Sequence, residues 1–173
     1  MSIFIDLGLV LGHHDVSVYG RRLAPASDWS KGIALSFLFA CSMLWLSGWI
    51  RLWCYRTLGR MFTYEVTLRD GHVLVTWGPY AYVRHPSYTG VVFGVLGTLL
   101  LHFGPGSWFY DGGWLETRGG LAYAGFWVGM EAYVLMCIMT RVPKEDGLLK
   151  SQFKDKWTAW AAKVPYRVVP GLY

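Results

Sequence analysis

Cysteine is scarce in this chain. Three of the 173 residues are cysteines, and they stand far apart, at Cys41, Cys54 and Cys137. This number and spacing match neither a disulfide framework nor the paired ligands of a zinc site. The run His13-His14-Asp15 lacks any partner cluster in the sequence, so we expect no metal.

Charged side chains are also few. They account for 16% of the residues, whereas about a quarter of an ordinary soluble domain is charged. The formal net charge is +5, yet the basic residues form no stripe that would follow a nucleic-acid backbone, so we expect no nucleic-acid partner. In a chain that enters a bilayer, such a charge bears on orientation and on contacts with membrane lipid.

Apolar residues, by contrast, arrive in long blocks. Hydrophobic residues make up 54% of the chain, and three blocks of about 20 residues are long enough to cross the hydrocarbon layer as helices. They cover residues 33–53, 88–109 and 121–140. We therefore predict an all-α integral membrane protein: a small transmembrane helix bundle at 33–173 behind a poorly defined segment at 1–32.

The borders of these blocks carry further signals. The second and third read as a helical hairpin joined by a short loop at 110–120, and Gly104-Pro105-Gly106 predicts the end of the first arm. Arg51 and Arg56 flank the first block, where their long side chains can snorkel to the interface. Glu131 stands alone in the third block. A functional role is the default hypothesis for such a carboxylate, and pairing inside the bundle is the alternative.

Two short runs between the first and second blocks have β-type composition. Residues 62–68 and 73–76 flank a turn signal at 69–72, which is typical of a hairpin. Extended chain lying on the membrane face is the other interpretation. In either case the backbone groups need partners outside the hydrocarbon.

The tail at 141–173 is basic and amphipathic. Its apolar residues recur every three or four positions, which predicts a helix of interfacial type. Arg141 and Glu145 share a face if the helix runs through Pro143; a surface ion pair and a simple anchor are the plain alternatives. Residues 51–85 and this tail are both rich in Arg and Lys, so the positive-inside rule puts both on the cytosolic side.

Turn residues, tyrosines and an Arg-His pair are concentrated at 78–90. Gly78-Pro79 predicts a turn. Pro86 suits the first turn of a helix and pushes His85 out of the helical conformation. A helix start offers free N–H groups to carboxylates and phosphates. The alternative is an interfacial anchor of tyrosines and a snorkelling arginine.

Three motifs together resemble the isoprenylcysteine carboxyl methyltransferase family. They are the stretch 78–90, Arg141 with Glu145 and Asp146, and Val164-Pro165-Tyr166-Arg167 followed by Pro170. The resemblance runs from about Leu58 to Tyr173 and is greatest to fungal members. It implies a membrane enzyme that uses S-adenosylmethionine (SAM) and releases S-adenosylhomocysteine, with a cytosolic cofactor pocket closed by the C-terminal amphipathic helix.

The resemblance also implies roles for individual residues. Arg141 and Glu145 match the catalytic pair on the substrate side. An upstream cofactor contact falls on Glu65 or Thr67 and stays open. Asp146 stands where the family often has Glu, and the N-terminal part is short. The positions that match cofactor-binding residues are His72, Val73, Leu74, Val75, Tyr80, His85, Pro86, Ser87 and Tyr88.

The reaction implied is methylation of the C-terminal carboxylate of a prenylated cysteine, or of a small lipid-like analogue, at the endoplasmic reticulum membrane. The leading alternative is a membrane N-methyltransferase acting on a phospholipid or another amine. A sterol reductase that binds NADPH and a non-catalytic lipid-binding protein are more distant alternatives. The sequence indicates no oligomeric state.

Overall fold

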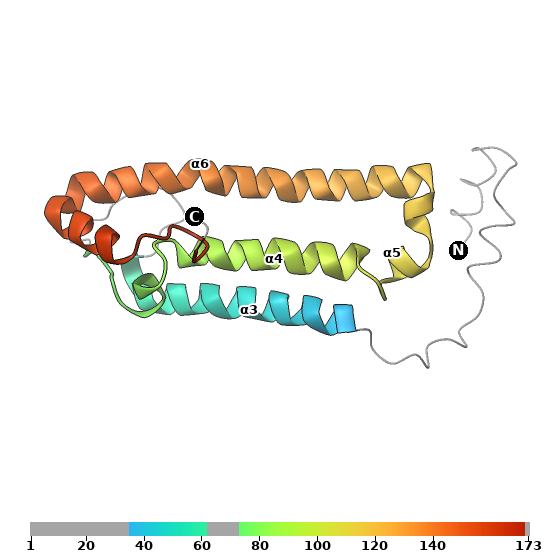
Figure 1. Cartoon of the computed structure of the whole chain (residues 1–173), viewed down its shortest axis with the longest axis horizontal. Helices are drawn as coiled ribbons and strands as arrows, with labels where there is room; N and C mark the ends of the chain where they lie inside the picture. The colour runs from blue at the N-terminus through green and yellow to red at the C-terminus, as the bar shows by residue number, and fades with distance from the viewer. Residues whose placement is uncertain (1–34, 62–72, 172–173) are drawn as a thin grey trace, which may run out of the picture.

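Three long helices lie side by side in the computed structural model of the chain, which describes residues 35–61 and 73–171 (Figure 1). They are α3 (Leu35–Leu58), α4 (Pro86–Phe103) and α6 (Arg118–Lys163). Each is long and apolar enough to cross a membrane, which confirms the predicted all-helical, multi-pass class. The shorter helical elements are η2 (Gly59–Met61), η3 (Gly78–Ala81), α5 (Trp108–Asp111) and η4 (Trp114–Glu116).

Helices α3 and α4 pack closely because glycines line their contact. A Cβ atom at Gly94 would lie 2.9 Å from Ser47 Oγ, and one at Gly97 would lie 3.1 Å from the Ala40 carbonyl oxygen. Gly90 continues the same row one turn earlier, facing Arg51. Small residues at this spacing let two membrane helices approach backbone to backbone, where dispersion forces hold them.

Helix α6 contacts the rest of the molecule near its start and again around its midpoint. Near the start, Tyr123 and Trp127 meet the rings of Phe103, Phe109 and His102. Around the midpoint, Ile138 and Val142 form a buried cluster with Val168, against which Tyr88 and Val91 pack. Between these two contacts most apolar side chains are exposed, as Tyr133 is at 58%. Glu131 is half-buried on the face that carries Trp127 and Ile138.

The third predicted span and the tail helix are one continuous element. Helix α6 has 46 residues and passes through Pro143, so the predicted span at 121–140 and the start of the tail belong to one helix. Proline is tolerated within membrane helices when neighbouring groups satisfy the freed carbonyl. The helical path is broken later, at Lys154, where φ is 45° and ψ is −114°.

The connection between α4 and α6 is more ordered than the loop predicted at 110–120. Helix α4 ends at Phe103, before Gly104-Pro105-Gly106, as predicted. The chain then forms α5 and η4, each closed by its own backbone hydrogen bonds. The Ser36 hydroxyl donates to the Pro105 carbonyl, which ties this turn to the start of α3.

Several expectations concern residues outside the described ranges. These are the segment 1–32 with His13-His14-Asp15, the run 62–68 of the possible hairpin, and the turn at 69–72. Residues 73–76 are described, and no strand is assigned to them.

We expect Gly97→Val to force α3 and α4 apart. Any Cβ atom there would lie 3.0 Å from Leu44 Cγ as well as 3.1 Å from the Ala40 carbonyl, and overpacking of this kind costs about 1–3 kcal/mol. The thermal unfolding midpoint of the detergent-solubilised chain should fall by several degrees. Gly129→Val is the matched control, because a Cβ atom at Gly129 would meet no other atom within 4 Å. Equal midpoints for the two variants would contradict the packing assignment.

Candidate functional site

Three segments that are distant in sequence meet at one end of the bundle (Figure 1). They are the start of α4, the part of α6 around Glu145, and the tail at 164–168. The backbone N–H groups of Arg84 and His85 donate to the carbonyls of Tyr166 and Arg167, at 3.0 Å and 2.8 Å. The prediction that the motif at 78–90 and the tail lie at the same end is thereby confirmed.

Local sequence explains how the start of α4 is presented. Pro86 occupies the first turn of α4, and His85 before it has φ −126° and ψ 63°, outside the helical region, as predicted. Gly78 has φ +62°, a conformation that suits glycine. The turn at Gly78-Pro79 packs against the end of α3, since a Cβ at Gly78 would lie 3.2 Å from Thr57 Oγ1.

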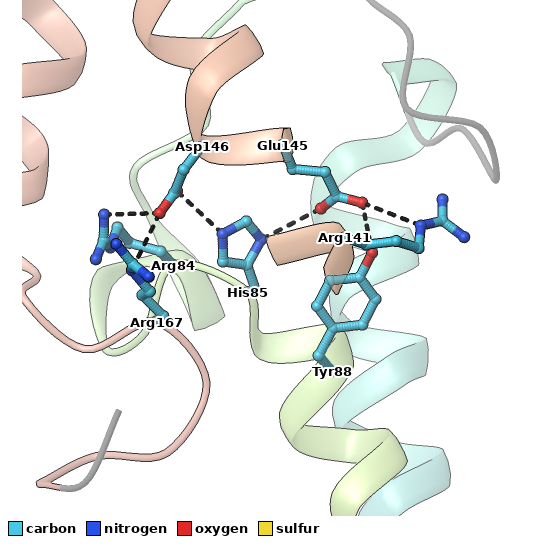
Figure 2. A network of polar contacts seen from close by, with 7 residues as sticks. All are labelled: Arg84, His85, Tyr88, Arg141, Glu145, Asp146 and Arg167. Atoms are coloured by element: carbon cyan, nitrogen blue, oxygen red, sulfur yellow. Dashed lines mark hydrogen bonds and ion pairs between the residues drawn. The ribbon is translucent and has the colours of Figure 1, made fainter. Parts of the chain in front are cut away.

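Figure 2 shows the imidazole of His85 lying between two carboxylates that are consecutive on α6. His85 Nδ1 is 3.3 Å from Glu145 Oε2, and His85 Nε2 is 3.0 Å from Asp146 Oδ1. Both ring nitrogens are therefore engaged by acids of the protein itself.

Asp146 is the centre of the buried half of this network. Its carboxylate is 3.0 Å from Arg84 Nη1 and 3.4 Å from Arg167 Nε, in addition to His85. The Arg84 guanidinium also donates to the Pro165 carbonyl at 3.1 Å and lies over the Trp157 ring. The sequence showed Asp146 only as a difference from the Glu that the family often has at this position, and it predicted no catalytic or binding role for Arg84 and Arg167. The one indication that these residues matter was that they lie inside the motifs that resemble the family.

Glu145 belongs to the more open half of the network. The Tyr88 hydroxyl donates to Glu145 Oε1, and Arg141 Nε lies 3.7 Å from the same oxygen, one helical turn away. The predicted pairing of Arg141 with Glu145 on one face of a continuous helix is confirmed. The Arg141 side chain keeps 40% of its surface exposed, although its Nε atom is buried.

The surroundings decide the charge of His85. Burial favours the neutral ring, but the hydrogen bonds and the negative charges of Asp146 and Glu145 outweigh it, so the pKa of His85 is raised from its ordinary value. Burial, with the nearby Cys54 thiol and Glu145 carboxylate, raises the pKa of the Tyr80 hydroxyl far above its usual range. Tyr80 is therefore a neutral hydrogen-bonding group, whereas His85 favours the imidazolium form.

The other predicted cofactor-binding residues surround this network unevenly. Tyr80 is half-buried, and its carbonyl accepts a hydrogen bond from Trp160 Nε1 at 3.2 Å. Pro86 is buried and Ser87 half-buried in the first turn of α4. Along the strip before the turn, Val75 is buried, Leu74 half-buried and Val73 exposed. His72 lies outside the described residues.

Helix α3 contributes a polar pair that the sequence did not predict. Arg51 is half-buried, and its Nη2 donates to the Tyr55 hydroxyl at 2.6 Å. Its aliphatic stem packs beside Gly90, so Arg51 faces α4 rather than snorkelling outward. The i, i+4 spacing of Arg51 and Tyr55 was the available signal.

A half-open pocket of about 140 Å³ lies on α3 and is lined by Trp49, Leu52, Trp53 and Arg56. It does not lie between α4 and α6. A cofactor pocket closed by the C-terminal helix therefore stays a prediction.

The family model for isoprenylcysteine carboxyl methyltransferases matches residues 39–109, which run from α3 into α5. Protein-S-isoprenylcysteine O-methyltransferase B of Arabidopsis thaliana is 30% identical over 129 residues, which are 73% of this chain and 56% of that protein. The Schizosaccharomyces pombe protein-S-isoprenylcysteine O-methyltransferase is 41% identical over 129 residues, 73% of this chain and 46% of its own length. The Saccharomyces cerevisiae protein of that name is 33% identical over 80 residues, 45% of this chain and 34% of its own length.

The chain thus spans about half the length, or less, of the curated relatives it matches. Plant and fungal proteins both match, so the predicted fungal subtype is not resolved. No solved structure matches the chain significantly. Residues 39–109 thus match the isoprenylcysteine carboxyl methyltransferase family model, and nearly three quarters of the sequence is similar to protein-S-isoprenylcysteine O-methyltransferases of a plant and a yeast.

Proposed function

We propose that this chain methylates the C-terminal carboxylate of a prenylated cysteine, or of a close lipid-like analogue, with SAM as the methyl donor. The observation that carries the proposal is the group formed by Arg141, Glu145 and Tyr88. It places a partly exposed guanidinium and a held carboxylate where α6 passes out of its apolar stretch. The match to the family model supports the reaction class.

A carboxylate acceptor sets simple requirements. It is already anionic at neutral pH, so no general base is needed to activate it. It needs a cation that orients it without suppressing its nucleophilicity. Arg141 presents a planar fork suited to a carboxylate, and Glu145, 3.7 Å away, fixes the guanidinium and offsets part of its charge.

The lipid part of the acceptor needs an apolar surface next to these polar groups. Helix α6 offers one directly before Arg141, where exposed side chains such as Met136 face outward. A prenyl chain lying among these side chains would leave its carboxylate at the level of Arg141.

The donor set of the site fits SAM, which supplies the methyl group from its sulfonium. Tyr80 and Tyr88 would provide aromatic surface for the cofactor. The backbone of the strip before the turn would provide hydrogen-bond donors and acceptors for the adenine, and we assign His72, Val73, Leu74 and Val75 to this strip. Pro86 and Ser87 open a helix whose positive dipole end suits the carboxylate of the methionyl tail. Arginines outnumber acids in the network around Asp146, which also favours anionic groups. Methyl transfer is an in-line displacement, so alignment by these residues would supply much of the rate enhancement.

We assign the site end of the bundle to the cytosolic face, because both basic segments lie at that end. The endoplasmic reticulum is the proposed membrane. The partner would be a prenylated protein C-terminus. An amine acceptor is the second candidate, and a site carboxylate such as Glu145 would then have to take the amine proton.

The reaction is tested with purified chain in detergent or nanodiscs, methyl-labelled SAM and a farnesyl-cysteine analogue. We expect labelled product that loses its methyl group in mild base, as an ester does. A base-stable product formed from a phospholipid or amine would replace the carboxyl acceptor with the second candidate. Binding of S-adenosylhomocysteine without any methyl transfer, under the same conditions, would overturn both.

Arg141→Ala should lower kcat/KM for the carboxylate acceptor by about 10- to 100-fold, the range expected for a charged hydrogen bond worth about 1.5–3 kcal/mol. The affinity for S-adenosylhomocysteine, measured by calorimetry, should stay close to that of the unaltered chain. Arg118→Ala is the matched control, because it removes an arginine from the first residue of α6, far from the site. Its activity should be retained. Equal losses in both variants would contradict a specific role for Arg141.

A further inference from the structure

The most deeply buried acid in the described part of the chain is not one of the residues assigned to the reaction. Asp146 is 6% exposed, and its two carboxylate oxygens contact Arg84, His85 and Arg167. These partners come from the entrance to α4 and from the tail. The carboxylate therefore joins both segments to α6, directly beside Glu145.

The geometry around His85 links Asp146 to Glu145. Consecutive residues on a helix point about 100° apart, so one side chain can contact both only if it lies between them. His85 does so, with Nε2 at 3.0 Å from Asp146 and Nδ1 at 3.3 Å from Glu145. Asp146, His85 and Glu145 form a line that continues to the Tyr88 hydroxyl, as Figure 2 shows.

The charge state of the ring follows from this line. A neutral imidazole has one N–H, so one of its nitrogens would turn a lone pair toward a carboxylate. The imidazolium donates from both nitrogens and satisfies both acids. The charged and titratable groups facing it are Asp146, Glu145 and Arg141 from α6, Tyr88 from α4, Arg84 before α4, and Arg167 from the tail.

We propose that Asp146 is a positioning residue: it holds His85 as an imidazolium whose Nδ1–H fixes the Glu145 carboxylate beside Arg141 and Tyr88. Asp146 touches neither substrate nor cofactor in this role and acts through His85. His85 in turn positions Glu145 through its ring, because both of its ring nitrogens are engaged by the two acids. The activity part of this inference rests on the proposed methyl transfer, whereas the ionisation part does not.

The ionisation part is tested by NMR on the full chain with nitrogen-15-labelled histidine in detergent micelles. The chain has five histidines, and His85→Gln identifies the His85 signals. In the unaltered chain the ring should stay doubly protonated above the ordinary histidine pKa of about 6.5. In Asp146→Asn the loss of one negative charge should move its titration to lower pH. Asp155→Asn, an exposed acid on the same helix, should leave it unchanged.

A neutral His85 at pH 7 in the unaltered chain would overturn the proposal, and so would a His85 titration that is the same in Asp146→Asn as in Asp155→Asn. These readouts need no acceptor. They stand or fall independently of whether the chain methylates a prenylated cysteine.

The kinetic part uses Asp146→Asn and Asp146→Glu with matched folding checks by thermal unfolding. For Asp146→Asn we expect kcat to fall about 10- to 100-fold and the alkaline limb of the pH profile to move to lower pH, since the imidazolium loses its proton more easily. Asp146→Glu keeps the charge and should restore the position of that limb. If kcat falls equally at every pH and the alkaline limb of the profile does not move, Asp146 only holds the tail in place. That result would overturn the positioning role.

Discussion

A buried carboxylate must be paired, and in this protein the pairing of Asp146 determines where three segments of the chain meet. Removing one partner of such a buried pair commonly costs about 3–5 kcal/mol, because the remaining charge is left uncompensated. Arg84, His85 and Arg167 are the groups that prevent this cost. The same three residues take part in the backbone hydrogen bonds between the entrance to α4 and the tail. The N–H groups of Arg84 and His85 donate to the carbonyls of Tyr166 and Arg167. Charge pairing and backbone pairing therefore select the same arrangement.

The rest of the bundle divides into a close pair and a looser third helix. Helices α3 and α4 approach through the glycine row, which leaves little freedom for one to slide on the other. Helix α6 is held near its start by stacked aromatic rings and around its midpoint by the cluster of Ile138, Val142 and Val168. The apolar stretch between these two contacts is exposed and available to lipid. The polar network thus stands on a firm two-helix base and beside a surface that lipid-like molecules can reach.

Local features were predictable from sequence, and long-range pairings were not. Pro86 at a helix start, His85 outside helical geometry, and the turn at Gly78 each follow from the backbone preferences of one or two residues. The pairing of Arg141 with Glu145 followed from helical spacing. Asp146 could not be ranked above other acids, because its partners Arg84 and His85 lie 62 and 61 positions away, a separation that no local period encodes. The continuity of α6 through Pro143 was left open for a related reason, since only neighbouring structure decides whether a proline ends a helix.

The length of α6 has a consequence for where chemistry can occur. At about 1.5 Å per residue, the part of α6 from Arg118 to the break at Lys154 is already much longer than the ~30 Å thickness of the hydrocarbon layer. The apolar part fills the layer, so the remainder projects into the aqueous phase, and Arg141 lies where one medium gives way to the other. A molecule with a greasy body and an ionic head would straddle that boundary at Arg141 with each part in the solvent it prefers, and would reach the polar groups by lateral diffusion in the plane of the bilayer.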